Sequence, residues 1–408
     1  AGEPLPNPGV LTPATHPRAQ PIAPVPAWGF GERLRVRGFT NTAAGLPTAA
    51  LADEILLEGS GQVKALICVG GNPVAAWPDQ QRTAAAMKRL ELLVSLDPEM
   101  STTAKLAHYV IAPRLSFEQP GITLPVETLS AYAYTMGYEV PYAQYTPQLV
   151  DPPAGSDVIE EWQFFFELAR SMGLALSLDS AFPWIAGGQH AAPVALDMTH
   201  APTTDALLGI LTRGSRIPLA EVRNHPHGHV FDDVTVAVAP KDPACTAKLE
   251  LADPVMLAEL KEVADEAGVT APGYAFRLIP RRLPDVYNSY GRSIARLVRK
   301  QRHNPAFLHP DDLREIGVAP GDMVEILSRH DSILGVAEAD EGLRRGVVSM
   351  THAFGDLHGA DDEAAVRRTG SNTGRLIAVD RDFDPYTGIP RMSAVPVDVR
   401  RYAGSAAG

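Results

Sequence analysis

Two short polar segments, each following an apolar run, are the residues best suited to chemistry in this sequence. Gly70-Gly71-Asn72-Pro73 follows the run Val63–Val69, and Asp97 follows Leu92–Leu96. Glycines let a backbone approach a ligand closely, and a carboxylate can accept paired N–H bonds from the Watson–Crick edge of guanine. The spacing is not the Gly-x-Gly-x-x-Gly fingerprint, which disfavours a nicotinamide cofactor. Two interpretations stay open: a nucleotide site, or a strand-end turn whose Asp caps the next helix.

The elements that position these segments follow an α/β pattern. The runs Val63–Val69 and Leu92–Leu96 are typical of strands buried on both faces, and Asp79–Leu90 between them is rich in helix formers. A third strand is expected at Tyr109–Ala112. Strand–helix–strand order predicts a parallel sheet. In such sheets ligands bind beyond the carboxyl ends of the strands, where both polar segments are expected.

The middle of the chain, residues 116–274, is predicted to consist of helices and loops. Asp157-Val158-Ile159-Glu160 has the pattern of a capping box, and Gly173 is suited to end the helix that follows. We expect one helical stripe to be core, formed by Ile159, Trp162, Phe165, Phe166 and Ala169. Shorter helices are predicted at 205–211 and 255–264, ending at Gly214 and Gly268.

From residue 275 onward, short apolar runs separated by turns predict a compact β-barrel. A short helix is expected at His309–Gly317. The predicted strands are Phe276–Ile279, Met323–Leu327, Ile333–Val336, Gly346–Met350 and Val395–Val399. At the other end, residues 1–44 are proline-rich, and we predict a linker or extended arm there.

Composition excludes several classes of function. The chain has 408 residues and a net charge of -12 without a block of basic residues, which disfavours nucleic acid as a partner. No apolar run approaches the roughly 18 residues needed to span a bilayer. The two cysteines, Cys68 and Cys245, cannot hold an iron–sulfur cluster alone. Cys68 is expected to be a buried structural thiol. His225-Pro226-His227-Gly228-His229 favours a loop over a zinc site, because no thiol or acid stands at metal-site spacing.

The sequence resembles the molybdopterin oxidoreductase family, of the dimethyl-sulfoxide-reductase and formate-dehydrogenase type, in two ordered blocks. The first block comprises Ala65–Pro73, Leu93–Pro98, Thr102–Ala104, Tyr109–Pro113 and Glu118. The resemblance implies that residues 45–115 form half of an α/β dinucleotide-binding domain. It also implies that the Gly-x-Asn-Pro turn lies at the cofactor and that Asp97 binds the guanine of the cofactor. The cofactor-binding residues implied here are Gly71, Asn72, Pro73, Asp97, Ser101 and Thr102.

The second block covers the predicted barrel, residues 275–408. It comprises His309–Asp312, Ile316-Gly317, Gly321–Val324, Gly346–Val348, Asn372–Leu376 and Asp384–Pro390. The resemblance implies a double-psi-like barrel that binds the molybdopterin dinucleotide. The residues expected to line the pterin and diphosphate are Arg282, Asn288, Ser289, His352, Asn372 and Thr373. The sequence departs from the first block's pattern at Ser101-Thr102-Thr103-Ala104, where the family often has Thr-Glu-Thr-Ala, and at Ala107-His108, where it often has Ala-Asp.

The resemblance implies the C-terminal part of an enzyme that binds bis(molybdopterin guanine dinucleotide) with molybdenum or tungsten for two-electron redox chemistry. Formate, oxyanions and sulfoxides are the substrate classes it leaves open. The metal ligand and any iron–sulfur cluster are expected in a missing N-terminal half, so that this chain is inactive alone. An electron-transfer partner and a cytoplasmic location are expected, with a periplasmic one as the alternative because an export signal would lie upstream. The competing hypothesis is a cofactor-free relative, like the large iron–sulfur subunit of respiratory complex I.

Overall fold

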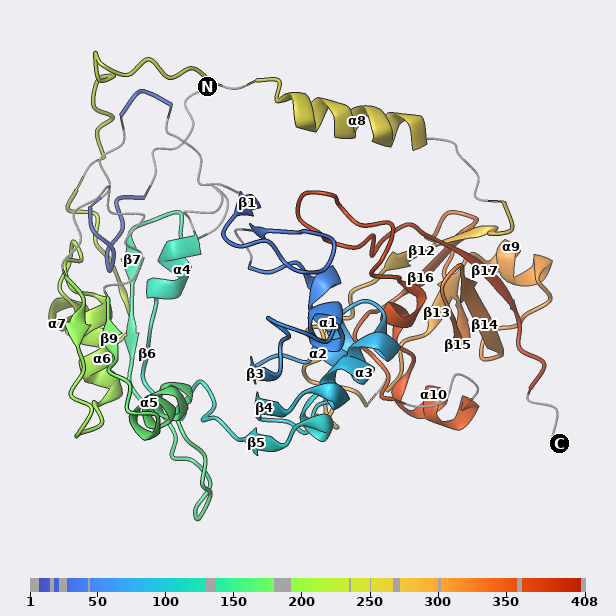
Figure 1. Ribbon diagram of the computed structural model, residues 1–408, viewed down its shortest axis with the longest axis horizontal. Coiled ribbons are helices and arrows are strands. Elements are labelled where there is room, and N and C mark those ends of the chain that lie inside the picture. Colours follow the sequence, from blue (N-terminus) through green and yellow to red (C-terminus); the bar gives the residue numbers. More distant parts are fainter. Residues whose placement is uncertain are drawn as a thin grey trace. The chain divides into compact units, whose positions relative to one another are not determined.

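The chain divides into two compact units in the computed structural model. Unit 1 comprises residues 1–23 and 112–251, and unit 2 comprises residues 24–111 and 252–408. Figure 1 shows the elements of both units. The structure describes residues 7–14, 18–21, 28–42, 45–129, 137–179, 192–234, 236–249, 251–266, 272–299, 302–357 and 362–404.

Unit 2 contains a parallel sheet of three strands in the order β3–β4–β5. These strands are β3 (Ala65–Val69), β4 (Leu92–Leu96) and β5 (Tyr109–Ile111), so the predicted strands and their parallel pairing are confirmed. The N–H of Gly70 lies 2.9 Å from the carbonyl oxygen of Leu96, and the N–H of Asp97 lies 3.1 Å from that of Ile111. The turns after β3 and β4 therefore lie at the same edge of the sheet.

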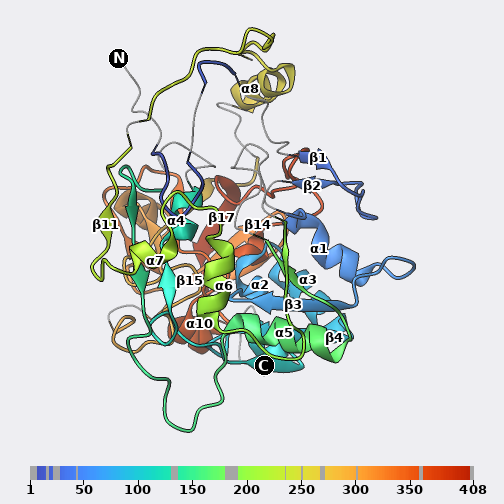
Figure 2. The ribbon, with the colours of Figure 1, turned by 90° about the vertical axis from the view of Figure 1, so that its left-hand side faces the viewer.

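Helices cover one face of this sheet. The prediction of strands buried on both faces is confirmed for β4, where Leu93, Val94 and Leu96 are buried, but it is wrong for β3. Val69 is 44% exposed and Tyr109 is 64% exposed. On the covered face Ile55, Met87 and Leu93 form a buried cluster, and Figure 2 shows the helices beside the sheet. The helical elements are α1 (Thr48–Leu56), α2 (Pro73–Ala76), α3 (Gln80–Arg89) and the 3-10 turn η1 (Ala104–Leu106).

A closed barrel of six strands forms the second part of unit 2, in the order β12–β16–β13–β15–β14–β17. The pairs β12–β16 and β13–β15 are parallel, and the other neighbours are antiparallel. The predicted barrel is confirmed, and Leu308, Ile326 and Val348 lie fully buried in its core. The strands are β12 (Phe276–Pro280), β13 (Ala306–Leu308), β14 (Met323–Ser328), β15 (Ser332–Ala339), β16 (Val347–Met350) and β17 (Val395–Arg401).

Strand β13 was not predicted, because its three residues are too few to reveal an alternating pattern. The predicted helix at His309–Gly317 forms as α9, and His309 caps it by accepting the N–H of Asp311 at 3.1 Å. Figure 1 shows α9 and α10 outside the barrel strands. The remaining elements of unit 2 are β1 (Trp28–Phe30), β2 (Asn41–Thr42), α8 (Pro254–Glu266), α9 (Pro310–Glu315), α10 (Glu363–Thr369) and the 3-10 turn η2 (Thr373–Leu376).

The described residues of unit 1 form short helices and three two-stranded sheets, β6–β8, β7–β11 and β9–β10. Val10 and Leu11 of the proline-rich segment are buried in its core beside Val222 and Phe231. Pro4, Pro6, Pro17, Pro24 and Pro26 of that segment, and Gly268, lie outside the described residues. The elements are β6 (Gly121–Ile122), α4 (Leu124–Leu129), β7 (Tyr142–Ala143), β8 (Tyr145–Thr146), α5 (Glu161–Ser171), β9 (Ser177–Leu178), β10 (Val194–Ala195), α6 (Thr204–Leu211), α7 (Leu219–Val222) and β11 (His229–Val230).

Two predictions about α5, its capping box and its buried stripe, need correction. The capping box is formed by Glu160 and Gln163, not by Asp157, because the chain is still extended at Glu160. The predicted core stripe is also too wide: Phe166 is buried, whereas Phe165 is 40% exposed. A helix buries only the stripe that faces its neighbours, and two adjacent residues point about 100° apart.

Candidate functional site

The turn after β3 carries three of the predicted site residues. Gly70 has a φ of +58°, so this glycine has the left-handed backbone that other residues rarely adopt. A side-chain carbon added at Gly71 would meet its nearest neighbours at ordinary contact distance. The backbone conformation therefore requires glycine at Gly70. At Gly71 the absence of a side chain leaves the backbone accessible to a ligand. Pro73 follows as the first residue of α2 and is buried.

Asn72 lies in this turn with its side-chain amide held in one orientation. Its Oδ1 accepts the N–H of Thr103 at 3.1 Å and the hydroxyl of Thr103 at 2.9 Å. The hydroxyl oxygen of Thr103 in turn accepts the N–H of Val74 at 3.0 Å. The Nδ2 of Asn72 is buried and has no hydrogen-bond partner among the described residues. An unpaired buried donor costs free energy, so this nitrogen is suited to a ligand's acceptor.

Asp97 follows β4 at the same edge of the sheet and is only 6% exposed. Its Oδ1 accepts the N–H of Glu99 at 2.9 Å, so the interpretation of this Asp as a local cap describes part of its geometry. A carboxylate has about four acceptor positions, and this bond uses one of them. Asp97 therefore keeps the capacity to accept paired N–H groups from a base.

The hydroxyl groups of Ser101 and Thr102 make contacts within the protein. The Oγ of Ser101 accepts the N–H of Ala104 at 3.2 Å. Thr102 donates to Oδ1 of Asp356 at 2.7 Å, and Lys105 donates to Oδ2 of the same carboxylate at 2.7 Å. Asp356 thus joins the segment before β5 to the barrel, across 254 positions in the sequence.

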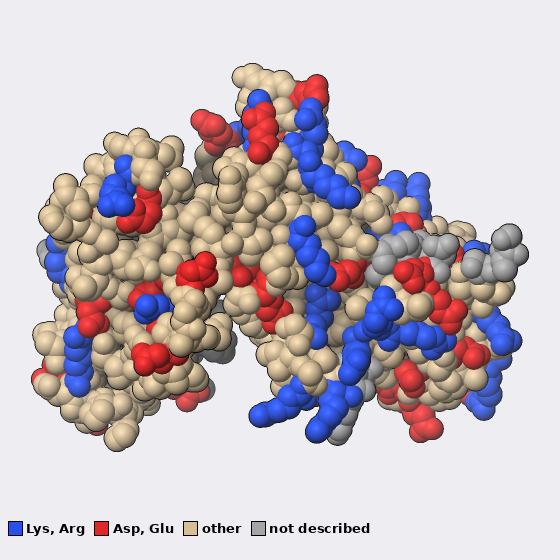
Figure 3. All heavy atoms as spheres, turned by 90° about the horizontal axis from the view of Figure 1, so that it is seen from below, with Lys and Arg blue, Asp and Glu red and all other residues tan. Residues whose placement is uncertain are grey.

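A cleft of about 380 Å³ opens beside these residues. Ser101, Thr102 and Ser289, three of the predicted residues, line it together. Its charged lining residues are Glu99, Lys105, Arg292, Arg302, Asp356 and Arg368. The excess of cationic groups suits the cleft to a phosphate or another anion. Figure 3 shows one face of the molecule, on which Lys and Arg side chains gather among Asp and Glu.

The charges in this cleft influence one another. Burial lowers the pKa of Arg292, while the nearby carboxylates of Asp356 and Glu99 act to raise it. Burial acts to raise the pKa of Asp356, but hydrogen bonds from Lys105 and Thr102 and the charges of Lys105 and Arg292 outweigh it, so that the pKa is lowered. Asp356 is therefore ionised at neutral pH and partly balances the cations.

Arg282, Asn288 and His352 form a second group of predicted residues, in the loops after β12 and β16. The guanidinium of Arg282 donates to Oδ1 of Asn288, and Asn288 has a left-handed backbone with a φ of 55°. Burial lowers the pKa of His352, and the positive charge of Arg282 lowers it further. His352 is therefore neutral at pH 7 and can both donate and accept hydrogen bonds.

Asn372 and Thr373 are buried at the start of η2. Asn372 donates from Nδ2 to the carbonyl oxygen of Ala75 at 2.9 Å, and its Oδ1 accepts the N–H of Gly374 at 2.8 Å. Its amide thus joins the barrel to α2, directly after the Asn72 turn. The structure gives Asn372 a structural role, and binding by its side chain stays a prediction.

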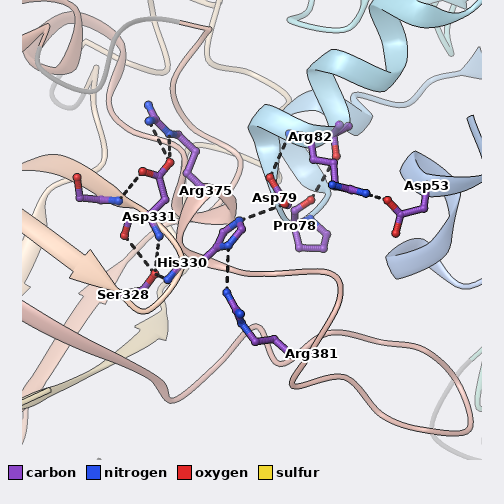
Figure 4. Close-up of polar contacts among 11 residues, drawn as sticks. Asp53, Pro78, Asp79, Arg82, Ser328, His330, Asp331, Arg375 and Arg381 are labelled. Carbon is purple, nitrogen blue, oxygen red and sulfur yellow. Dashed lines mark hydrogen bonds and ion pairs between the residues drawn. The ribbon is translucent and has the colours of Figure 1, made fainter. Parts of the chain in front are cut away.

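A polar network joins the β14–β15 turn of the barrel to the start of α3 (Figure 4). His330, in the β14–β15 turn, places Nε2 3.1 Å from Oδ2 of Asp79, the residue that caps α3. Its Nδ1 lies 3.4 Å from a guanidinium nitrogen of Arg381. Because arginine only donates, Nδ1 must be the acceptor and Nε2 carries the proton towards Asp79. Arg375 pairs with Asp331 in the same turn.

Cys68 is buried on β3, as predicted. Burial raises the pKa of its thiol to about 11, with a further contribution from the charge of Asp97. The folded protein holds the thiol proton more tightly than the unfolded chain does. The contribution of this thiol to folding stability is therefore complete below its ordinary pKa and is lost as the pH rises through about 11.

We expect iodoacetamide at pH 8 to modify Cys245 in the native protein and to leave Cys68 unmodified, because the thiolate is the reactive form. Mass spectrometry of tryptic peptides measures both sites. Denatured protein, in which both cysteines should react, is the control. Equal native rates at the two cysteines would contradict the burial of Cys68.

The histidines of the segment 225–229 lie in unit 1. His225 stacks on His229 with ring centroids 4.2 Å apart, and its Nε2 lies 3.4 Å from Oε1 of Glu221. Within the described ranges, no group of three or more His, Cys, Asp or Glu side chains is placed to hold a metal ion. None of the helices in the same ranges is long and apolar enough to cross a membrane.

Sequence reasoning missed three residues that the geometry brings into the site. Thr103 holds Asn72, while Arg292 and Asp356 line the cleft. Thr103 stood beside two predicted residues, but the sequence did not indicate which hydroxyl points to Asn72. Arg292 and Asp356 carried no distinguishing local pattern.

Comparison with known proteins shows which proteins the chain is similar to. Residues 276–396 match the molydopterin dinucleotide binding domain. The chain is 23% identical over 325 residues to the F420-dependent formate dehydrogenase subunit alpha of Methanocaldococcus jannaschii, covering 76% of this chain and 41% of that protein. The chain is related to the molybdopterin oxidoreductases. The resemblance seen in the sequence is thereby confirmed.

Two further comparisons define the extent of the likeness to this family. The NADPH-Fe(3+) oxidoreductase subunit alpha of Geobacter sulfurreducens is 33% identical over 126 residues, which is 30% of this chain and 13% of that protein. The structure of acetylene hydratase from Pelobacter acetylenicus shares the fold, with a TM-score of 0.53 and 19% identity, over 87% of this chain and 46% of that chain. The chain therefore spans less than half the length of these molybdopterin-family relatives.

Proposed function

We propose that this chain forms part of a molybdopterin oxidoreductase and binds a molybdopterin guanine dinucleotide. The observation that carries the proposal is the buried Nδ2 of Asn72, which has no hydrogen-bond partner among the described residues. It lies at the carboxyl edge of a parallel sheet, the edge at which Asp97 also lies. Ligands bind at this edge in open parallel sheets. A buried donor without a partner in such a place fits a ligand that brings an acceptor.

The donor set fits the chemical parts of this cofactor. Asp97 would accept the paired N–H groups of guanine, and the cations of the cleft beside Ser101 and Thr102 suit a diphosphate. Arg282, Asn288 and neutral His352 offer donors and acceptors suited to the edges of a pterin. When bound, the cofactor supplies two-electron redox chemistry at its metal, while the protein binds and orients it.

The exposure of the two outer strands of the β3–β4–β5 sheet supports a further part of the proposal. Parallel sheets normally have both faces covered, whereas Val69 and Tyr109 are exposed here. We propose that an N-terminal part of the same enzyme completes this dinucleotide-binding domain beside the double-psi-like barrel. That part would carry the molybdenum or tungsten ligand and any iron–sulfur cluster, so that this chain alone is inactive. A small-molecule substrate, an electron-transfer partner and a cytoplasmic location complete the proposal.

The test is cofactor analysis of the chain produced together with its genomic upstream sequence, in a host that makes the cofactor. Metal is measured by mass spectrometry and guanine nucleotide by chromatography after acid release. We expect molybdenum or tungsten with about two guanine nucleotides per chain, as in a bis-dinucleotide site. A folded protein that contains neither would refute the proposal and favour a cofactor-free structural relative.

A further inference from the structure

We infer that Thr103 is a positioning residue that locks the amide of Asn72 with its NH2 group free, so that the cofactor atom facing Asn72 must be a hydrogen-bond acceptor. This inference deepens the proposed function and rests on it. Thr103 is fully buried and does not need to touch the cofactor itself. The inference follows from the direction of each hydrogen bond in the chain Val74–Thr103–Asn72.

The direction of this chain is determined by its backbone donors. The N–H of Val74 can only donate, so the hydroxyl oxygen of Thr103 accepts it at 3.0 Å. The single hydroxyl proton of Thr103 is then available to Asn72, 2.9 Å away. The Thr103 N–H also points at the same atom of Asn72, at 3.1 Å. Two donors therefore face that atom, which must be the amide oxygen.

The opposite amide orientation is excluded by the same geometry. It would place the NH2 group of Asn72 against the N–H of Thr103, donor against donor. The NH2 group therefore occupies the other position, where no acceptor of the described residues reaches it. The carbonyl oxygen of Asn72 is not available to this NH2 group either, because it already accepts the N–H groups of Ala75 and Ala76.

This polarity restricts the chemistry of the contact. A phosphate oxygen, a ribose hydroxyl or a ring carbonyl can accept from the NH2 group, whereas a ring N–H or an amino group cannot. Asn72 and Thr103 come from different turns, after β3 and after β4. The turn after β4 therefore orients, through Thr103, the residue of the turn after β3 that contacts the ligand.

Five variants of the holoenzyme test the inference, with guanine nucleotide retained per chain after dialysis as the readout. Thr103→Val should raise the rate of nucleotide loss about five-fold, the equivalent of one hydrogen bond, and Thr103→Ser should restore it. Asn72→Asp preserves the shape and the acceptor for Thr103, but it presents an anionic oxygen to the ligand. It should therefore accelerate loss by roughly 100-fold or more. In an Asn72→Ala background, Thr103→Val should have no further effect on retention.

Thr83→Val is the matched control. Thr83 is also buried in unit 2 and donates to the carbonyl oxygen of Pro78 at 3.2 Å, so its loss reproduces the cost of a buried threonine without touching Asn72. Wild-type protein without nucleotide would refute the proposed function itself. If wild type retains nucleotide and Asn72→Asp retains it equally well, the NH2 group does not serve a cofactor acceptor, and the inference fails. If Thr103→Val accelerates nucleotide loss equally in the wild-type and the Asn72→Ala backgrounds, Thr103 does not act through Asn72 and has only a structural role.

Discussion

Replacing Asp97 with alanine should reduce the guanine nucleotide bound by the holoenzyme, with affinity weaker by roughly 100-fold or more. A hydrogen bond to a charged group contributes about 1.5–3 kcal/mol, and the carboxylate would make two such bonds to one base edge. Asp97→Asn should also weaken binding, because the substitution removes the charge and replaces an acceptor with a donor. The measurement is guanine nucleotide released by acid per chain, with metal content measured in the same sample.

Asp362→Ala is the matched control for this prediction. Asp362 also accepts a backbone N–H, that of Ala365 at 2.8 Å, and it caps α10 away from the edge of the sheet. Both alanine variants lose a local cap, but only the Asp97 variant should lose nucleotide. If Asp97→Ala retains nucleotide at the wild-type level, Asp97 is a turn-capping residue and the guanine lies elsewhere.

Replacing Asn304 with alanine should destabilise the protein by about 3–5 kcal/mol, because each polar group left unpaired costs about 1–3 kcal/mol. Asn304 is 1% exposed. Its Nδ2 donates to the carbonyl oxygens of Thr351 at 2.6 Å and Ser371 at 2.8 Å, and its Oδ1 accepts the N–H of Ser371 at 2.8 Å. One side chain thus joins the two loops that carry His352 and Asn372.

Thermal unfolding followed by circular dichroism measures this effect, and we expect the melting temperature to fall by several degrees. Asn224→Ala is the control, because Asn224 is exposed and its side chain makes one hydrogen bond among the described residues, to Glu221. Guanine nucleotide retention should fall with stability in Asn304→Ala, since both loops lose their common support. An unchanged melting temperature would show that the loops are held by other contacts.

The sequence alone determined the local elements and the order in which they occur. Continuous apolar runs predicted β3 and β4, and the helix formers between Asp79 and Leu90 predicted α3. The carboxyl-edge position of Asn72 and Asp97 followed from strand order, since parallel strands end at one edge. The barrel followed from short strands separated by turns.

Tertiary structure alone decided which polar groups meet and which stay unpaired. Thr102 and Asp356 are 254 positions apart and meet through one hydrogen bond. No local pattern encodes such a pair, because it depends on how the barrel packs against the segment before β5. The same holds for Asn72: its residue type suggested a ligand contact, but the free donor at Nδ2 exists only because Thr103 occupies the oxygen. Residue types set the hydrogen-bonding capacity of the site, and packing decided which part of that capacity is left for a ligand.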